Sequence, residues 1–265
     1  MKRIIVCIKP VPDPQHWNEV SMDPVTKTLK REGIPSIINP LDKHALEAAL
    51  SIRETHGGEV VVLSMAPPFA TSIIREGLAM GADRAILLSD PLFAGSDTLA
   101  TARILSAGCR YIGEFDMVLC GNLSIDGSTA QVCSQLAEFL DLPNVMHVIG
   151  LDWQDRERII VTQKIEHGCV RLEAAPPLVL SVRKELNKPR YIPFTGIIEA
   201  ESKEIRELSN EDLHIDPAGI GLGGSPTKMA DLEIRRFERA KERIRGSAEE
   251  IAVKLADKIY QYGII

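Results

Sequence analysis

The sequence predicts an α/β fold built on a doubly wound, mostly parallel sheet. Three observations support this. Short apolar runs alternate with amphipathic stretches of helical length, Gly or Pro residues bound the runs, and the alternation persists to about residue 142. Repeated strand–helix–strand units with right-handed crossovers cover both faces of a parallel sheet with helices. We therefore expect a Rossmann-like domain, followed by an antiparallel extension and a C-terminal helical arm.

The elements of the first half follow from local patterns. Residues 3–9 form an apolar run that three closely spaced prolines end, which predicts a buried strand followed by a loop. Residues 15–39 lack periodicity and predict an exposed flap with a short hairpin, 20–22 against 28–30. A helix of good helix formers follows Asn39-Pro40. The further strands are expected at 59–65, 84–88 and 117–120, and the further helices at 69–80, at 96–111 and after residue 128.

The pattern changes after residue 143. Strand-like segments at 145–151, 158–165 and 178–182 are joined by short connections, which favours an antiparallel extension. The α/β domain is therefore expected to span residues 1–198, and an arm to span 199–265. The glycine loop at 219–224 follows no predicted strand and lacks phosphate-loop spacing, so it is interpreted as a hinge. Two mixed-charge helices are expected in the arm, at 229–245 and 248–260.

Composition excludes several classes of protein. A formal net charge of −6 gives no electrostatic reason to bind nucleic acid. The five cysteines are odd in number and show no C-x-x-C spacing, which argues against a disulfide framework or a zinc site and suits a reducing cytoplasm. The N-terminal apolar run is too short for a secretory signal, and no stretch approaches a membrane span. We expect a cytoplasmic protein that does not insert into membranes.

The chemistry of the chain points to binding. There is no evident nucleophile with a base partner, no H-E-x-x-H motif and no Walker A lysine, so neither catalytic residues nor a metal site are predicted. Aromatic residues make up only 5% of the chain. A redox cofactor would therefore be held largely by backbone and polar groups.

The stretch 116–142 reads as strand, glycine-containing loop and amphipathic helix. Gly121 ends the strand, and Asp126, Gly127, Ser128 and Thr129 stand at the expected start of the helix. A helix N-terminus offers unpaired N–H groups and a positive dipole end to an anion such as a phosphate. These residues also suit simple helix capping, and local sequence does not decide between the two interpretations.

Other strand ends supply further candidates. In open α/β sheets, ligands lie outside the carboxyl ends of the strands, where Lys9, Pro10, Val11 and Asp13 follow the first strand. The alternative for this segment is a rigid turn. Asn39 is a candidate for facing the same ligand, although an Asn in this position also serves as a cap or turn residue.

Four segments resemble one family, the electron-transfer flavoprotein beta (small) subunits. They are GNLSIDGSTAQVCSQLAEFLDLP, with an IDG-x-TAQ pattern, and INPLDKHALEAAL, GLAMGADRAILLSD and VRKELNKPRY. The resemblance implies a nucleotide whose phosphates lie at the IDG-x-TAQ loop, and an arm that wraps a larger alpha subunit. Together with the strand ends, it gives the expected cofactor-binding residues Lys9, Pro10, Val11, Asp13, Asn39, Met65, Ala66, Pro67, Cys120, Gly121, Asp126, Gly127, Ser128, Thr129, Ala130 and Gln131.

Within the family, DPVTKTLKREGIPSIINPLDKHALEAAL and FAGSDTLATA resemble the electron-bifurcating members. This resemblance implies FAD where simpler relatives bind AMP. It also implies electron exchange between NADH, an acyl-CoA dehydrogenase and ferredoxin or flavodoxin. Ala66 and Ser128 depart from a glycine and an acidic residue common in the family. NADH is expected to approach Pro68, Gly95, Ser96, Asp97 and Thr98, although capping explains Ser96 and Asp97 nearly as well.

A partner-recognition segment is implied at Arg190, Tyr191 and Phe194, with Phe194 as an apolar anchor or, alternatively, as part of the chain's own core. Two other functions stay open. One is a non-bifurcating beta subunit that binds AMP and passes electrons from an acyl-CoA dehydrogenase to a quinone reductase. The other is a stand-alone adenine-nucleotide enzyme or sensor.

Overall fold

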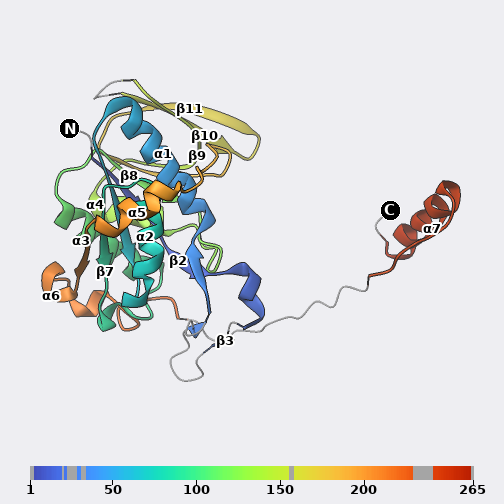
Figure 1. Ribbon diagram of the computed structural model, residues 1–265, viewed down its shortest axis with the longest axis horizontal. Coiled ribbons are helices and arrows are strands. Elements are labelled where there is room, and N and C mark those ends of the chain that lie inside the picture. The colour runs from blue at the N-terminus through green and yellow to red at the C-terminus, as the bar shows by residue number, and fades with distance from the viewer. Residues whose placement is uncertain are drawn as a thin grey trace. The chain divides into compact units, whose positions relative to one another are not determined.

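The chain forms two compact units, Met1–Ala230 and Asp231–Ile265. The computed structural model describes residues 3–19, 21–22, 29–30, 34–154, 158–228 and 241–263. The larger unit is a sheet with helices on both faces (Figure 1), so the predicted α/β class is confirmed.

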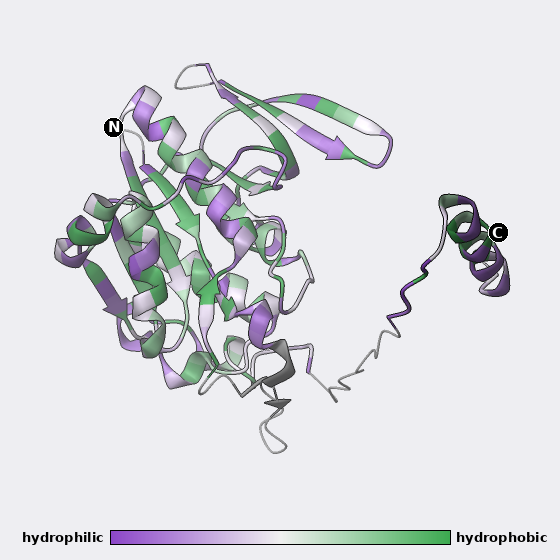
Figure 2. Cartoon of the chain, turned by 45° about the vertical axis from the view of Figure 1, so that its right-hand side comes forward, coloured by the Kyte–Doolittle hydropathy of each residue, from purple (hydrophilic) through white to green (hydrophobic). Residues whose placement is uncertain are grey.

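One nine-stranded sheet, in the order β11-β10-β9-β12-β8-β1-β6-β7-β13, organises the larger unit. In the part of this order that runs from β9 through β12, β8, β1, β6 and β7 to β13, each strand is parallel to the next. Figure 2 shows the central strands in green, the colour of hydrophobic residues, as expected for strands buried on both faces. The strands are β1 (Arg3–Cys7), β6 (Glu59–Met65), β7 (Arg84–Leu88), β8 (Met117–Gly121), β9 (Asn144–Trp153), β10 (Ile159–Ile165), β11 (Gly168–Ala174), β12 (Leu178–Val182) and β13 (Ile205–Leu208).

The direction in which strands are added reverses at β1. From β1 the chain adds β6 and β7 on one side, and then crosses back to place β8 on the other side of β1. Ligands of open α/β sheets bind outside the carboxyl ends of strands at such a switch point. A ligand site is therefore expected at the loops that follow β1 and β8.

Helices cover the two faces and create two cores. α1, α2 and α5 pack on one face, where Leu46, Ile74 and Ala200 meet the strands, and α3 and α4 pack on the other, where Ile104 and Leu136 do so. The α-helices of this unit are α1 (Pro40–His56), α2 (Thr71–Met80), α3 (Thr98–Ile112), α4 (Val132–Leu140), α5 (Phe194–Ser202) and α6 (Asn210–Leu213), and its 3-10 helices are η1 (Pro14–Glu19), η2 (Pro68–Ala70), η3 (Pro91–Phe93) and η4 (Pro217–Gly219).

Two small sheets accompany the main one. β2 (Pro10–Pro12) pairs antiparallel with β5 (Ser36–Ile38), and β3 (Ser21–Met22) pairs antiparallel with β4 (Leu29–Lys30). The second pairing is the hairpin that the sequence predicts within the flap.

The extension after residue 143 is antiparallel only in part. β10 pairs antiparallel with both β9 and β11, as predicted, but β9 itself runs parallel to β12. β12 returns into the parallel sheet between β8 and β9, so the expectation that 178–182 belongs to an antiparallel extension is wrong, whereas 145–151 lies in β9, which is parallel to β12 on one side and antiparallel to β10 on the other. β11 was not expected, because most of its side chains are solvent-exposed and carry no buried pattern.

The compact unit extends beyond the predicted boundary at residue 198. β13 pairs with β7 at the edge of the main sheet, and α5 packs against α2. Gly196 explains this close packing, because a Cβ at that position would lie 2.4 Å from the carbonyl oxygen of Ala79. Residues 199–228 therefore belong with the α/β unit rather than with an arm.

The second unit contains α7 (Ala248–Gln261), which confirms the predicted helix at 248–260. Ser247 begins it with a capping box, in which its hydroxyl accepts the N–H of Glu250 and the Glu250 carboxylate accepts the N–H of Ser247. The other predicted helix, 229–245, falls mostly on residues outside the described ranges, and residues 241–245 are not helical.

Candidate functional site

An ion pair bridges the switch point between β1 and β8. The ammonium nitrogen of Lys9, which follows β1, lies 2.7 Å from Oδ1 of Asp126 in the loop after β8, and it donates to the Ser124 hydroxyl at 3.3 Å. The Asp126 side chain is only 3% exposed, whereas that of Lys9 is 42% exposed. This geometry leaves the cation at the surface of the site and the carboxylate beneath it.

Asp126 therefore organises the loop from inside. Its Oδ1 also accepts the N–H of Gly127 at 2.8 Å. An ionised carboxylate repels a phosphate, so the expectation that Asp126 itself holds a phosphate does not fit this arrangement. Its contribution is to hold Lys9 and the start of the exposed loop.

Asn39 holds the same loop from the other side. Its side-chain amide nitrogen donates to the carbonyl oxygen of Leu123 and to Oδ1 of Asp42, both at 2.9 Å, while its oxygen accepts the N–H of Ile125 at 3.2 Å. Asn39 is 1% exposed. Its side chain thus faces the turn at 123–125, and it makes no side-chain cap to α1.

Asp42 is a residue of this site that sequence reasoning missed. It is buried in the first turn of α1, where its Oδ2 accepts the backbone N–H of Lys9 at 2.8 Å. Burial raises the pKa of Asp42 to about 7, although the hydrogen bonds from Asn39 and Lys9 lower it. Gly121 makes room for this carboxylate, because a Cβ there would lie 2.2 Å from its Oδ1. In the sequence, Asp42 looks like an ordinary acidic residue of a helix start.

The loop between β8 and α4 projects its hydroxyl-bearing residues outward. Gly127, Ser128, Thr129 and Gln131 are exposed. Ser128 and Ala130 have left-handed backbones, with φ of 50° and 55°. The helix begins at Val132, so the expectation that it starts near residue 128 is wrong, and no side chain caps it. The polar residues instead form a loop ahead of the helix.

The segment after β6 runs along the same edge. The N–H of Ala66 donates to the carbonyl oxygen of Leu88 at 3.1 Å, and Met65 and Ala66 are partly buried. Pro67 and Pro68 lead into η2, where Phe69 is 59% exposed. These residues lie at a strand end, as predicted.

The turn at 95–98 has its polar groups engaged within the chain. Oδ1 of Asp97 accepts the N–H groups of Leu99 and Ala100, each at 3.0 Å, and Oδ2 accepts the N–H of Thr227 at 2.9 Å. The Ser96 hydroxyl donates to the carbonyl oxygen of Phe93 at 2.8 Å. Capping and packing therefore account for both side chains.

The glycine loop at 219–224 packs on this turn and is not a free hinge. The N–H of Gly221 donates to the Ser96 hydroxyl at 3.0 Å, and the N–H of Asp97 donates to the buried hydroxyl of Ser225 at 2.8 Å. Leu222 explains Gly95, since a Cβ on that left-handed glycine would lie 3.0 Å from the Leu222 Cβ. Thr98 is the member of this turn that reaches the loop before α4, because its hydroxyl donates to Oε1 of Gln131 at 3.2 Å.

Some predicted residues point into the protein. Pro10 and Val11 are buried in β2, and Asp13 lies beyond it with a half-buried side chain. The Cys120 thiol is buried and hydrogen-bonded with those of Cys7 and Cys133. The hydrogen bond to Cys120, together with burial, raises the pKa of both Cys7 and Cys133. Val11 and Cys120 can therefore meet a ligand only through their backbone.

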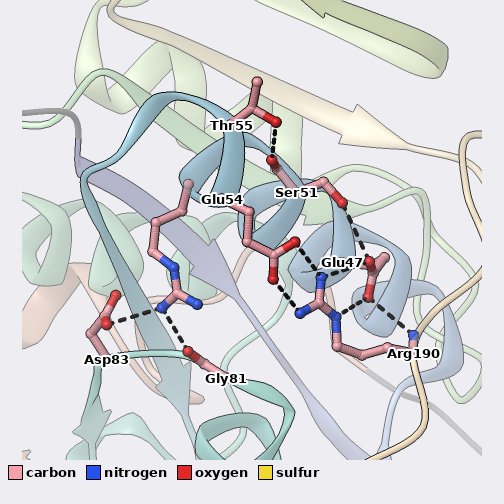
Figure 3. A network of polar contacts seen from close by, with 8 residues as sticks. Glu47, Ser51, Glu54, Thr55, Gly81, Asp83 and Arg190 are labelled. Carbon is pink, nitrogen blue, oxygen red and sulfur yellow. Dashed lines mark hydrogen bonds and ion pairs between the residues drawn. The ribbon is translucent and has the colours of Figure 1, made fainter.

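The predicted recognition segment divides into a half-buried anchor, Arg190, and an exposed surface. Figure 3 shows the Arg190 guanidinium between the carboxylates of Glu47 and Glu54 on α1. Glu47 also accepts the backbone N–H of Arg190 at 3.0 Å, and the two carboxylates raise the pKa of Arg190. Arg190 thus ties this segment to α1 and offers little of its guanidinium to a partner.

The residues after Arg190 are apolar and exposed. Tyr191 is 89% exposed and Phe194 is 76% exposed. Ile197 and Ile198 on α5 are also exposed, and we call these four residues the α5 patch. Because Phe194 lies at the surface, it is not part of this chain's core. Grouped apolar residues on a surface are typical of a protein–protein contact.

Two further absences hold for the part of the chain that the structure describes. No group of three or more His, Cys, Asp or Glu side chains there could hold a metal ion. No described helix has both the length and the apolar character needed to cross a lipid bilayer.

A doubly wound sheet with a polar loop at its switch point is typical of proteins that bind nucleotides. The model of the electron transfer flavoprotein domain matches residues 26–213. The chain is 46% identical to the electron transfer flavoprotein subunit beta of Thermoanaerobacterium thermosaccharolyticum over 99% of each chain. It is 44% identical to the caffeyl-CoA reductase-Etf complex subunit CarD of Acetobacterium woodii, over 99% of this chain and all of that one.

Protein FixA of Azorhizobium caulinodans is 42% identical, over 84% of this chain and 81% of its own length. These similarities, two of them over nearly the full length of both chains, confirm the resemblance seen in the sequence. The chain belongs to the electron transfer flavoprotein family, as a beta subunit of these electron carriers.

Proposed function

We propose that this chain binds FAD at the β1–β8 switch point and, with an alpha subunit, transfers electrons between NADH, an acyl-CoA dehydrogenase and ferredoxin or flavodoxin. The observation that carries the proposal is the exposed loop at 127–131, set beside the Lys9 ammonium at the carboxyl edge of the sheet. Hydroxyls, backbone N–H groups and a lysine are the groups that bind phosphates in such positions.

The residues present fit a dinucleotide or nucleotide. Gly127 leaves open space, since a Cβ there would meet nothing nearer than 3.7 Å. Ser128, Thr129 and Lys9 would hold phosphates, and the contact between Thr98 and Gln131 joins the loop to the segment after β7. A ligand longer than a mononucleotide could therefore extend along this edge. When bound, FAD would supply the redox chemistry that these side chains lack.

The 65–68 segment is the better candidate for the approach of NADH. Ser96 and Asp97 are engaged within the chain, and Gly95 accommodates Leu222. The 95–98 turn would therefore contribute to NADH binding mainly through the shape of its surface and not through polar contacts. The similarity to CarD, a subunit of a caffeyl-CoA reductase-Etf complex, favours electron exchange with an enzyme that acts on a CoA thioester.

The α5 patch is proposed as the docking surface for the acyl-CoA dehydrogenase. Its apolar residues stand on a segment that Arg190 fixes to α1, so a partner would meet a preorganised surface. The second unit, with α7, is proposed to wrap the alpha subunit. The side chains of α7 that are apolar and exposed include Val253 and Leu255.

The test is a cofactor count on the heterodimer, produced together with an alpha subunit. Two FAD and no AMP per heterodimer would support the proposal, and reduction of flavin by NADH in rapid mixing would support bifurcation. AMP in place of the second FAD, with reduction by an acyl-CoA dehydrogenase alone, would favour a non-bifurcating carrier that feeds a quinone reductase. If the heterodimer released neither FAD nor AMP from this site, both the bifurcating and the non-bifurcating function would be contradicted.

Loop variants test the site itself. Thr129→Val removes one hydroxyl and is expected to weaken nucleotide binding by about 1 kcal/mol, or several-fold in Kd. Gly127→Val adds bulk where the ligand is expected and should weaken binding further. Thr55→Val is the matched control, because Thr55 is an exposed threonine near the end of α1 whose hydroxyl donates to Ser51. Unchanged nucleotide content in both loop variants would exclude this loop.

A further inference from the structure

The buried carboxylate of Asp42 lies at the junction of the elements that form the proposed nucleotide site. Its two oxygens accept hydrogen bonds from different elements, Oδ1 from Asn39 at the start of α1 and Oδ2 from the N–H of Lys9 after β1. We propose that Asp42 is a positioning residue for the nucleotide site, which fixes the 123–126 turn and the Lys9–Asp126 ion pair through Asn39 and the Lys9 backbone. This inference rests on the proposed function.

The first link runs through the orientation of the Asn39 amide. Its nitrogen has two hydrogens, one directed to Asp42 and the other to the carbonyl oxygen of Leu123. Because Asp42 can only accept when ionised, it requires the nitrogen of Asn39 on its own side. The Asn39 oxygen is then left to accept the N–H of Ile125. Asp42 thereby supports the same amide orientation that the Leu123 carbonyl oxygen and the Ile125 N–H require.

The second link runs through the backbone of Lys9. Asp42 accepts the Lys9 N–H, and the Lys9 carbonyl oxygen accepts the N–H of Asn39 at 2.9 Å. Lys9 is therefore tied to the start of α1 both through its N–H and through its carbonyl oxygen. These two bonds fix the backbone of Lys9, from which its side chain extends to pair with Asp126.

Gly121 sets the distance between these parts. The end of β8 approaches the first turn of α1 so closely that a Cβ at Gly121 would lie 2.8 Å from the backbone nitrogen of Asp42. The turn that begins after Gly121 is thus placed against Asp42 and Asn39 before it reaches Asp126. Both partners of the Lys9–Asp126 ion pair are positioned from this one buried group.

The experiment measures nucleotide affinity and stability separately in the heterodimer. Kd for AMP and for FAD is obtained by equilibrium titration, unfolding is followed by circular dichroism, and amide hydrogen exchange is measured in peptides covering 122–126. The variants are Asp42→Ala and Asp42→Asn. The matched control is Asp116→Ala, because the Asp116 carboxylate accepts the N–H of Arg3 at 2.8 Å at the opposite end of β1.

Asp42→Ala should raise Kd about tenfold and speed exchange in the 122–126 turn, since two donors lose their acceptor. Asp42→Asn keeps one acceptor and should give a smaller increase in Kd. Asp116→Ala should lower the unfolding midpoint while leaving Kd within about twofold of the unmodified protein.

An unchanged Kd in folded Asp42→Ala, or in Asp42→Asn should the alanine variant not fold, would overturn the positioning role. An equal rise in Kd for Asp116→Ala would also overturn it, because the effect would then follow stability alone. If the unmodified heterodimer binds neither AMP nor FAD, the proposed function fails and this inference fails with it.

Discussion

Replacing Gly121 by Ala places a methyl group where the chain has no space. The added Cβ would lie 2.2 Å from Oδ1 of Asp42, 2.8 Å from its backbone nitrogen and 2.8 Å from the carbonyl carbon of Leu41. The carboxylate can rotate away only by giving up its hydrogen bonds to Asn39 and Lys9. The backbone atoms can move only if α1 shifts away from β8. Relief of the overlap therefore requires both kinds of change.

The expected cost follows from these two changes. Overpacking a buried site costs about 1–3 kcal/mol. Loss of two hydrogen bonds from a buried carboxylate adds about 1 kcal/mol for each bond. Together they predict a loss of about 3–5 kcal/mol in the free energy of unfolding, a large part of the stability of an ordinary domain.

Urea unfolding followed by circular dichroism, with linear extrapolation, measures this loss. Gly127→Ala is the matched control, because its Cβ would meet nothing nearer than the Ser124 hydroxyl oxygen at 3.7 Å. It should change the free energy of unfolding by less than about 1 kcal/mol. A loss below about 1 kcal/mol for Gly121→Ala would show that α1 can move away from β8 at little cost. It would refute the argument that this contact is tightly packed.

Three further predictions concern charge and surface. Because the folded pKa of Asp42 is about 7 and the ordinary value is 3.8, the folded state binds this proton more tightly than the unfolded state. The free energy of unfolding should therefore fall as pH rises between these values, by up to about 1.4 kcal/mol per pH unit. Asp42→Asn should remove this slope in urea titrations, and equal slopes would contradict the assignment. Arg190→Met leaves the carboxylate of Glu47 buried without its partner and should cost about 2–3 kcal/mol in thermal or urea unfolding, whereas Arg183→Met, at an exposed ion pair, should cost less than about 1 kcal/mol. Phe194→Ala should weaken binding of the acyl-CoA dehydrogenase by about 2 kcal/mol, or about 30-fold in Kd, with no change in Tm. A lower Tm with an unchanged Kd would instead mean that Phe194 packs within this chain.

The sequence by itself determined the fold class and the location of the loop before α4. Apolar runs bounded by Gly and Pro are local signals, and up to residue 142 they identified the strands of the main sheet and the α-helices with errors of a few residues at their ends, but not β2 or β5. Exposure of Phe194 excludes the alternative that this residue belongs to the core. The family motifs indicated where nucleotide and partners would bind, and these assignments stay predictions.

Only the tertiary structure decided which polar groups are engaged within the chain. Asp126 reads locally as part of a helix start, but its partner is Lys9, which lies far away in the sequence. Arg190 reads as a surface residue, yet two glutamates of α1 enclose its guanidinium. In each case the deciding partner comes from a distant part of the chain, so no local pattern could reveal it.

The same reason explains the errors in topology and the residue that was missed. β13 is a strand of only four residues, the middle two of them charged and exposed, and it forms because the edge of β7 offers hydrogen-bonding groups. The glycine loop at 219–224 finds its contacts on the 95–98 turn. Asp42 can be recognised as part of the site only from the folded chain, in which Gly121 and Lys9 lie beside it. Periodicity and turn chemistry act over a few residues, whereas burial and hydrogen bonding of a carboxylate depend on strands that meet across the sheet.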